Sequence, residues 1–197
     1  MEVRVATEHD VDGITATLTA AFEADPLWSW AFPGKGLADL WRLLISSALR
    51  YPWIWVADGY AAASVWVPPG GIELTEAEEA SLGPMLDDLI GSRASEVLSL
   101  FERLASAHPQ QPPHYYLSLL GTHPHHRGKG LGMALLADNL ARIDSEGMPA
   151  YLESSNPEND CRYERLGFVR AGEFQRPDEQ LTCSTMWREP RQTPSRR

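Results

Sequence analysis

The sequence is poor in cysteine, in basic residues and in long hydrophobic stretches. Its two cysteines, Cys161 and Cys183, are too few for a disulfide framework, which favours a reducing environment. No apolar run approaches the length of about 18 residues that marks a membrane-spanning helix, and the first residues lack the basic and apolar blocks of a signal peptide. We therefore expect a cytoplasmic protein with no membrane partner.

Positive charge is outnumbered by negative charge. The 17 Lys and Arg residues stand against 27 Asp and Glu residues, which gives a net charge of −10. Because nucleic-acid affinity comes mainly from neutralised phosphates, this balance excludes nucleic acid as the expected partner. An acidic surface instead attracts cationic small molecules. A chain of 197 residues with 43% hydrophobic residues is long enough for one domain with a sizeable core, as a monomer or homodimer.

The strongest local signal lies in residues 114–146. A hydrophobic run over 114–120 predicts a buried strand that breaks at Gly121 and Pro124. Three glycines at alternate positions then precede residues 133–146, whose apolar side chains recur at helical spacing. A glycine-rich turn at a helix start binds anions, because the first N–H groups of the helix are unpaired and glycine allows close approach. Arg127 and Lys129 add positive charge, so we interpret this turn as a pyrophosphate site.

The spacing of the glycines excludes two other phosphate-binding turns. A P-loop has four residues between its first Gly and Gly-Lys, whereas six separate Gly121 from Gly128. The dinucleotide fingerprint also fails, because Gly128, Gly130 and Gly132 leave no glycine at its third position.

A second motif follows at residues 151–168. Residues 151–152 are short and apolar after a Gly-Met-Pro break, which predicts a central strand. Asn156 is a good helix cap, with Pro157 at the first helical position. Tyr163 lies two turns after Asn156 and so shares its helical face, and Gly167 is placed to end the helix.

Together the two motifs resemble those of the GNAT N-acetyltransferase superfamily over about residues 115–174. HHRGKG at 125–130 is similar to the acyl-CoA turn Gln/Arg-x-x-Gly-x-Gly/Ala, with His125 in place of the usual Gln or Arg. NPENDCRYERLGF at 156–168 is similar to the segment Asn-x6-Tyr-x-x-x-Gly-Phe. The pattern is closest to puromycin N-acetyltransferase-like enzymes, on VRVAT at 3–7, WVAD at 55–58, HRGKGLG at 126–132, LESS at 152–155 and YERLGF at 163–168.

This resemblance implies an α/β (α+β) fold with a mixed, mostly antiparallel sheet of about seven strands, splayed between strands four and five, and helices on both faces. It implies one acetyltransferase domain over 1–189, with a helical insertion at about 72–110 and a disordered tail at 190–197. Elsewhere Thr7 and Asp10 form a capping box for a helix that runs to Phe22 and stops at Asp25. The other expected elements are strands at 2–6, 53–57, 60–67, 168–174 and 181–187, a helix at 37–50, and helices within 75–108 broken at Gly83-Pro84 and at Gly91.

The implied activity is transfer of acetyl from acetyl-CoA to the amine of a small molecule by direct attack in a ternary complex, with no metal. Antibiotics and other xenobiotic amines are candidate acceptors. An alkylamine has a pKa of about 10.4 and is protonated at neutral pH, so a base must remove its proton. An N–H donor must stabilise the developing oxyanion, and an acid must protonate the leaving thiolate.

Site residues follow from the resemblance and from side-chain chemistry. Tyr163 is the expected acid and Glu153 the expected base, with His114 and His123 as alternative bases. Main-chain groups of Leu119 and Gly121 are expected to pair with pantetheine and to supply the oxyanion donor. The expected cofactor-binding residues are Leu119, Leu120, Gly121, Arg127, Gly128, Lys129, Gly130, Leu131, Gly132, Asn156 and Tyr163. The expected substrate-binding residues are Phe22, Trp28, Trp30, Phe32 and His114.

Several alternatives stay open. The aromatic loop at 27–33 either lines an acceptor pocket or closes the core over a sheet edge. Tyr163 is also a candidate core tyrosine, and Asn156 a helix cap alone. The histidines at 123, 125 and 126 suggest a metal, which would compete with the phosphate turn. Two other functions stay open for the protein. One is acetylation of a protein N-terminus or lysine. The other is that of a non-catalytic acyl-CoA sensor, which would need no proton-handling groups.

Overall fold

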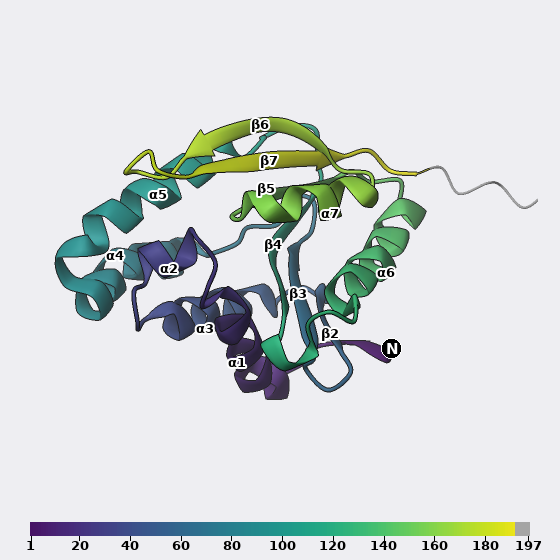
Figure 1. Cartoon of the computed structure of the whole chain (residues 1–197), viewed down its shortest axis with the longest axis horizontal. Coiled ribbons are helices and arrows are strands. Elements are labelled where there is room, and N and C mark those ends of the chain that lie inside the picture. Colours follow the sequence, from purple (N-terminus) through teal and green to yellow (C-terminus); the bar gives the residue numbers. More distant parts are fainter. Residues whose placement is uncertain (192–197) are drawn as a thin grey trace, which may run out of the picture.

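The computed structural model describes residues 1–191, so most of the tail expected at 190–197 lies outside the described residues. Its centre is a seven-stranded sheet with the order β1-β2-β3-β4-β5-β7-β6 (Figure 1). Neighbouring strands are antiparallel except β4 and β5, which are parallel. The strands are β1 Val3–Val5, β2 Ile54–Ala57, β3 Ala62–Val67, β4 Tyr115–Thr122, β5 Ala150–Ser154, β6 Val169–Gln175 and β7 Thr182–Arg188.

The sheet splays between β4 and β5. Their pairing runs from Tyr115 opposite Ala150 to Leu117 opposite Leu152 and goes no further. Beyond that point β4 continues beside β3, and Glu153 and Ser154 continue beside β7. The expected fold class is therefore confirmed, and the splay leaves one edge of each strand open.

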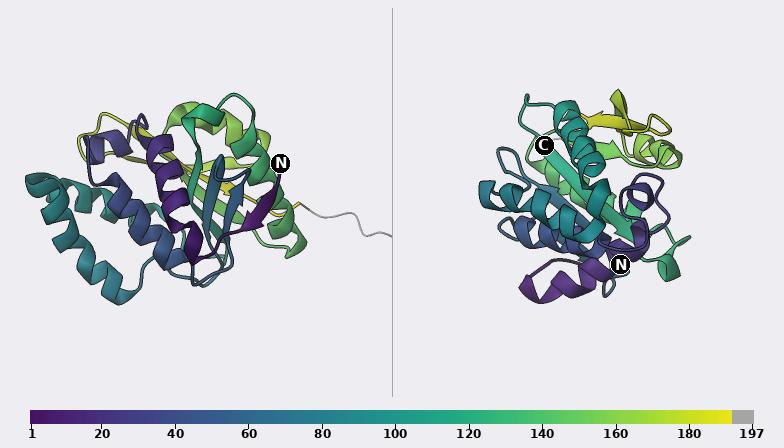
Figure 2. Two further views of the ribbon diagram at one scale, coloured as in Figure 1. Left: turned by 90° about the horizontal axis from the view of Figure 1, so that it is seen from below. Right: turned by 90° about the vertical axis from the view of Figure 1, so that its left-hand side faces the viewer.

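Helices cover both faces of the sheet (Figure 2). One core forms between the sheet and α1 Val11–Phe22, α2 Trp28–Ala31, α3 Leu37–Ala48, α4 Glu76–Ile90 and α5 Ala94–Ala107. The other core forms under α6 Leu131–Ser145, with α7 Asp160–Arg165 at its edge. The two cores separate because side chains alternate along each strand. On β2, for example, Ile54 and Val56 join the first core, while Trp55 and Ala57 join the second.

Short helical turns complete the chain: η1 Glu8–Asp10, η2 Gly91–Arg93, η3 Pro124–His126 and η4 Pro157–Asn159. The expected capping box at Thr7 and Asp10 is present. The Asp10 carboxylate also accepts hydrogen bonds from Arg4 at 2.6 and 2.8 Å and from the Tyr60 hydroxyl at 2.6 Å. The Arg4 guanidinium holds the pKa of Asp10 far below its usual range. This buried carboxylate therefore ties β1, α1 and the β2–β3 turn together.

Three expected boundaries are wrong. The segment expected as a loop contains α2, because the Asp25 carboxylate accepts the backbone N–H groups of Leu27 and Trp28 and so starts a new turn. Helix α4 continues through Pro84, which removes one backbone donor without ending the helix; of the two expected breaks, the one at Gly91 is present. Strand β4 does not stop at Gly121, which pairs with Ala63 of β3.

Candidate active site

Two cavities meet at Tyr163, on α7. One, of about 690 Å³, lies where β4 turns into α6, and we call it the turn cavity; its lining comes from 21–25, 120–122, 126–133 and 156–166. The other, of about 680 Å³, is the aromatic cavity; its lining comes from 22–44, 67–82, 101–120 and 152–174. The residues that line both cavities are Phe22, Leu120, Asn159 and Tyr163.

The backbone of the turn cavity has the shape of an anion site. Gly128 and Gly130 have φ values of 80° and 73°, in the left-handed region that favours glycine. A Cβ on either residue would meet open space, so the backbone conformation, not crowding, calls for glycine there. Helix α6 begins at Leu131, and its first residues line the cavity. Their N–H groups and the helix dipole therefore favour a bound anion.

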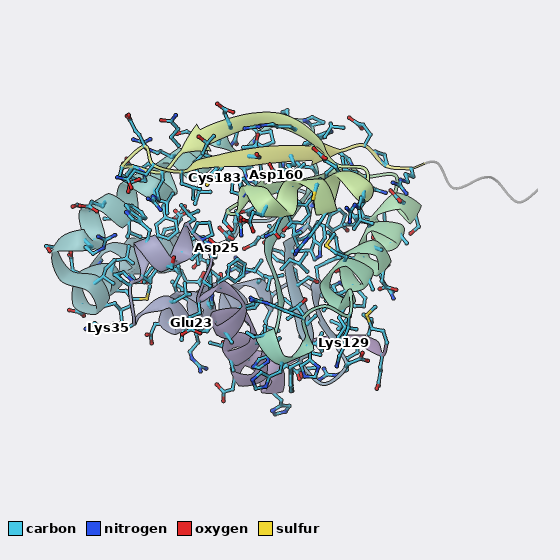
Figure 3. The ribbon with its side chains drawn as sticks, viewed as in Figure 1. Glu23, Asp25, Lys35, Lys129, Asp160 and Cys183 are labelled. Atoms are coloured by element: carbon cyan, nitrogen blue, oxygen red, sulfur yellow. The ribbon has the colours of Figure 1, made fainter. Side chains whose placement is uncertain are left out.

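Three arginines line the turn cavity: Arg127, Arg162 and Arg165. The Arg127 guanidinium donates to the Ala21 carbonyl at 2.7 Å, which links the turn to the end of α1. Lys129 is exposed and is not part of the lining (Figure 3). Two sets of positive groups, side chains and helix N–H groups, thus suit the diphosphate of coenzyme A.

The open edge of β4 forms one wall of this cavity. Because the His123 N–H donates to Ala61 of the β3 side, and hydrogen-bonded pairs alternate along an antiparallel ladder, Leu119 and Gly121 direct their backbone groups toward β3. The backbone groups of Leu120 and Thr122 therefore face the splay. The structure thus brings Leu120 and Thr122 to the position that we expected for Leu119 and Gly121.

Gly121 and Gly132 have a packing role. A Cβ on Gly121 would lie 2.7 Å from Leu18 of α1, and a Cβ on Gly132 would lie 2.5 Å from the Thr122 hydroxyl. These contacts bring α1 and α6 close to β4. Both glycines also line the turn cavity.

Tyr163 is half-buried between the cavities. Burial, together with the negative charges of Asp25 and Asp160, raises the pKa of Tyr163 to about 12. The phenol therefore keeps its proton at neutral pH. Asn156 precedes it by two turns, lines the turn cavity, and accepts the Glu158 N–H at 3.0 Å. Capping by Asn156 is thus present, and its position beside the cavity is compatible with a second role.

Asp25 is a buried carboxylate that sequence reasoning missed as a site residue. It lines the turn cavity and lies between α2 and α7 (Figure 3). One oxygen caps α2, and the other accepts the Ser155 hydroxyl at 2.7 Å. Burial raises the pKa of Asp25. Asp25 therefore links the end of β5 to the aromatic segment that contains α2.

Glu153 lies at the first position of β5 beyond the last β4 pair, and it lines the aromatic cavity. Its side chain is 6% exposed. One carboxylate oxygen lies 3.6 Å from Nδ1 of His108, the residue that ends α5. The helical insertion therefore contributes a titratable group beside the expected base. Nothing in the sequence near His108 marks it for this role.

His114 extends this arrangement. Its Nδ1 lies 2.8 Å from the Pro112 carbonyl and must donate, because a carbonyl only accepts. Burial lowers the pKa of His114, so the ring is neutral and its Nε2 accepts from Nε2 of His108 at 3.1 Å. Nδ1 of His108 is then the ring atom that faces Glu153, at 3.6 Å. The three side chains therefore lie in a row, with a hydrogen bond between the two histidines.

Glu73 is a second carboxylate in the aromatic cavity. It accepts the hydroxyl of Ser118, the β4 residue just past the last β5 pair. Burial raises the pKa of Glu73, and the charge of Glu153 raises it further. The two carboxylates thus approach the splay from different parts of the chain.

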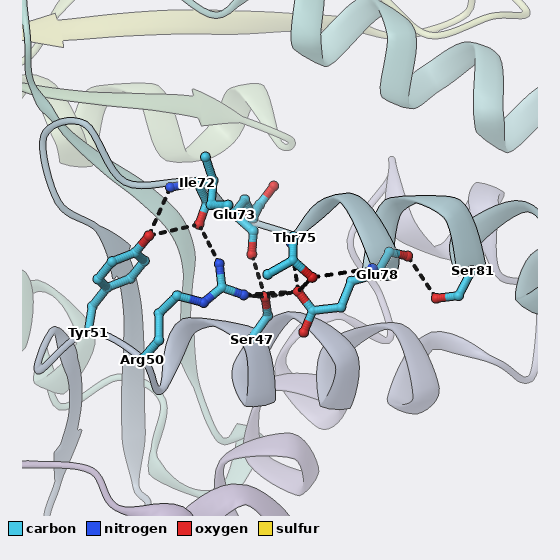
Figure 4. A network of polar contacts seen from close by, with 8 residues as sticks. All are labelled: Ser47, Arg50, Tyr51, Ile72, Glu73, Thr75, Glu78 and Ser81. Atoms are coloured by element: carbon cyan, nitrogen blue, oxygen red, sulfur yellow. Dashed lines mark hydrogen bonds and ion pairs between the residues drawn. The ribbon is translucent and has the colours of Figure 1, made fainter.

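A polar network holds Glu73 in place (Figure 4). The Ser47 hydroxyl donates to the Glu73 carbonyl at 2.8 Å and to Glu78 at 2.7 Å. Glu78 completes the capping box that starts α4 and is paired with Arg50 at 2.9 Å. Arg50 also donates to the Ile72 carbonyl at 3.2 Å. The loop before the insertion is therefore fixed from both sides.

The aromatic wall only partly matches expectation. Phe22, Trp28 and His114 line the aromatic cavity, and Trp28 packs edge-on against Trp41 with ring centres 4.8 Å apart. Trp30 and Phe32 are not in the lining. Trp30 lies between the guanidinium groups of Arg93 and Arg176, each 5.1 Å from its ring, because the single turn of α2 directs it away from Trp28. Phe32 is 3% exposed within the core. Trp28 therefore lines a cavity and Phe32 lies in the core, while the binding of an acceptor in that cavity stays a prediction.

Within residues 1–191, no group of three or more His, Cys, Asp or Glu side chains is arranged so that it could hold a metal ion. Nδ1 of His123 accepts the His125 N–H at 3.3 Å, so this histidine stabilises the turn. It lies outside both cavity linings, unlike His114. Cys161 is exposed and Cys183 is buried, and neither forms a disulfide.

Comparison with known families assigns this architecture. The sequence matches the profile of the Acetyltransferase (GNAT) family over residues 23–168, which include the turn, Glu153 and Tyr163. The chain belongs to the GNAT acetyltransferase family. GNAT enzymes use acetyl-CoA, which agrees with the positive, glycine-lined turn cavity.

Solved structures of other GNAT proteins share the fold over nearly the whole chain. One is described as histone acetyltransferase HPA2 and related acetyltransferase, from Corynebacterium glutamicum, with 27% identity, a TM-score of 0.66, and coverage of 98% of this chain and 97% of that one. An agmatine N-acetyltransferase mutant has 17% identity, a TM-score of 0.69 and coverage of 94% and 97%. Arylalkylamine N-acetyltransferase 2 from Aedes aegypti has 15% identity, a TM-score of 0.70 and coverage of 96% and 99%.

These three GNAT structures do not include a puromycin N-acetyltransferase, so that closer likeness stays a prediction. The two amine N-acetyltransferases support the fold only, since both are below 25% identical to this chain. Within residues 1–191, none of the helices combines the length and the hydropathy needed to cross a bilayer.

Proposed function

We propose that this GNAT protein is an acetyl-CoA-dependent N-acetyltransferase whose acceptor is a small-molecule amine. The observation that carries this proposal is the place of Tyr163, a protonated phenol where a positive cavity meets one lined by aromatic rings and carboxylates. A transferase needs its two substrates to meet at a group that handles protons. Tyr163 occupies that junction.

Residues of the turn cavity would hold the cofactor. The N–H groups of Leu131 and Gly132 and the guanidinium groups of Arg127 and Arg162 suit its diphosphate. The open edge of β4 suits its pantetheine arm, with the N–H of Leu120 as the donor for the acetyl oxygen. When bound, acetyl-CoA supplies a thioester that an amine can attack.

Proton handling is assigned to two side chains. Glu153 takes the proton of the incoming ammonium, which makes the amine nucleophilic, and passes it to Nδ1 of His108. Tyr163 gives its proton to the departing thiolate sulfur and later recovers one from solvent. Both roles use groups that the structure brings to the splay.

The first experiment measures thiol release from acetyl-CoA across a broad library of amines, with puromycin included, alongside calorimetry with coenzyme A. We expect coenzyme A to bind and some amines to accelerate thiol release. Binding without acceleration by any amine would favour an acyl-CoA sensor. No heat with coenzyme A would contradict the proposal altogether.

A second experiment tests the base. Glu153→Gln should lower kcat/KM about 100-fold, as is typical for loss of a general base, and should remove the acidic limb of the pH–rate profile. Glu79→Gln is the control, because Glu79 lines the same cavity but is exposed. An unchanged profile in Glu153→Gln would transfer the role to Glu73 or to a histidine.

Acetylation of a protein N-terminus or lysine is the second candidate function. The HPA2-related structure from Corynebacterium glutamicum, 27% identical, gives it support. The insertion helices α4 and α5 and the ring of Trp28 line the aromatic cavity, whose volume of about 680 Å³ suits a small acceptor. Incubation with a histone-tail peptide and with a small amine, in separate assays, distinguishes the two.

A further inference from the structure

The aromatic cavity has several acidic side chains in its lining, and histidines are its basic side chains. Among the described residues that form it, the carboxylates are Glu73, Glu79 and Glu153, and none of the residues is Lys or Arg. Glu79 is exposed, whereas Glu153 is almost fully buried and Glu73 is half-buried. The two inner carboxylates therefore stand in a weakly screened position.

These two carboxylates also lie close together. Ser118 of β4 donates its hydroxyl to Glu73, and Ser118 is next to the open end of the ladder where Glu153 follows on β5. The charge of Glu153 raises the pKa of Glu73, and burial together with the charges of both carboxylates raises the pKa of Tyr116 well above its ordinary value. Like charges held this close are unfavourable unless a cation shares them.

Nδ1 of His108 lies 3.6 Å from Glu153, and this ring carries charge only when it is protonated. His114 is neutral and therefore adds no charge. Glu73 has the Ser118 hydroxyl as its hydrogen-bond partner, which is neutral. One further positive charge would be accommodated between the carboxylates.

Apolar and aromatic side chains form the rest of the cavity. Phe22, Trp28, Trp41 and Phe101 come from α1, α2, α3 and α5 and line the same cavity as the carboxylates. Such rings suit an apolar body, and their faces also attract cations. A free carboxylate on the ligand would find no positive partner among them.

The geometry points to a dicarboxylate subsite, formed by Glu73 and Glu153, that binds the ammonium group of the acceptor while the aromatic wall holds an apolar body. The substrate class is thus a monocationic alkyl- or arylalkylamine without a carboxylate. This inference rests on the proposed N-acetyltransferase function and adds Glu73 as a specificity-determining residue of that site.

A ligand that binds without reacting tests the subsite. N,N-Dimethylphenethylamine is a cation at neutral pH, and as a tertiary amine it yields no stable amide. Calorimetry with the coenzyme A-saturated protein should give clear binding of this amine, and at least 10-fold weaker binding of 3-phenylpropionate, which has a similar body and the opposite charge. Equal binding of the two would overturn the inference.

Matched variants locate the charge. Glu73→Gln keeps an acceptor for the Ser118 hydroxyl and removes only the charge, so it should weaken amine binding about 10-fold or more while coenzyme A binding is unchanged. Glu79→Gln, in the same cavity but exposed, should change amine binding less than about 2-fold. Wild-type affinity in Glu73→Gln, with coenzyme A binding intact, would overturn the role of Glu73.

The outcome separates this inference from the proposed function. If the tertiary amine binds and Glu73→Gln weakens it, but no primary amine accelerates thiol release, the subsite stands and the transferase proposal fails. If thiol release is fastest with amines that carry a carboxylate, the transferase proposal stands and the subsite is wrong.

Discussion

The turn cavity and the aromatic cavity share four lining residues but are built in different ways. The turn of the turn cavity comes from one continuous segment, in which glycine conformations and the N–H groups at the start of α6 give the shape of an anion site. The aromatic cavity comes from α1, α2, α3, the insertion, β4 and β5, and its character depends on side chains. The first is a local property of the chain, and the second is a property of the assembled fold.

This difference separates reaction from specificity. A backbone site recognises a phosphate with little regard to neighbouring side chains, so it suits a cofactor shared by a whole family. A side-chain site changes its ligand whenever a residue such as Glu73 or Trp28 changes. The two cavities therefore have different sensitivities to substitution, which measurements on purified variants can resolve.

The largest expected effect is the loss of turnover after substitution of Tyr163, where the two cavities meet. Tyr163→Phe removes the hydroxyl and leaves the ring, so we expect kcat to fall about 100-fold at saturating acetyl-CoA with little change in coenzyme A affinity. Steady-state kinetics and calorimetry measure the two quantities. Unchanged turnover would show that Tyr163 only packs between the cavities.

The second-largest expected effect is on coenzyme A affinity, and it separates loss of the anion site from general backbone strain. Gly130→Leu should raise the dissociation constant for coenzyme A about 10-fold, because a side chain and a shifted turn disturb the anion site. Gly147→Leu is a matched control: Gly147 has a φ of 68°, open space around it, and a place at the opposite end of α6 outside both cavities. Both substitutions should lower the free energy of unfolding by about 1–2 kcal/mol. Equal loss of coenzyme A binding would remove the special role of the turn.

A smaller effect tests the aromatic wall. Trp28→Leu should raise KM for an arylalkylamine about 5-fold, whereas Trp30→Leu should change it less than about 2-fold, because only Trp28 lines the cavity. Coenzyme A affinity serves as the control for folding in both variants. Similar KM values in the two variants would mean that the wall does not contact the acceptor.

Much of the fold was predictable because its signals are local. The capping box at Thr7, the β-rich segments that form β2 and β3, and the Asn156–Gly167 helix limits each depend on a few adjacent residues, and all are present. Boundaries failed where tertiary contacts decide them. Gly121 stays in β4 because β3 pairs with it and α1 packs on it, which no residue adjacent to it in the sequence reveals.

The candidate site likewise has residues that the sequence predicts and residues that only the fold reveals. Family motifs and glycine spacing indicated the turn cavity and Tyr163, and the structure gathers most of those residues in one cavity. His108 and Glu73 were missed because the chain brings them to Glu153 across long sequence distances. Both are titratable residues near the ends of an insertion that contains no motif. The sequence alone does not mark such residues as part of a site. Trp30 was misplaced because one turn of helix directs it away from Trp28.

The smallest expected effect is on stability, and it tests the crowding of charge in the aromatic cavity. Burial raises the pKa of Glu73 in the folded protein above its ordinary value of 4.5. Folding therefore favours the protonated form, and the free energy of unfolding of the wild type falls as the pH rises above 4.5. Glu73→Gln removes this cost, and its Tm should exceed that of the wild type by about 2 °C at pH 7. The gain should shrink toward zero as the pH falls below 4.5, because the unfolded chain then also protonates Glu73. Thermal unfolding from pH 4 to pH 8 measures this, with Glu79→Gln as the control that should follow the wild type. A lower Tm for Glu73→Gln at pH 7 would mean that a positive group already neutralises Glu73 in the free protein.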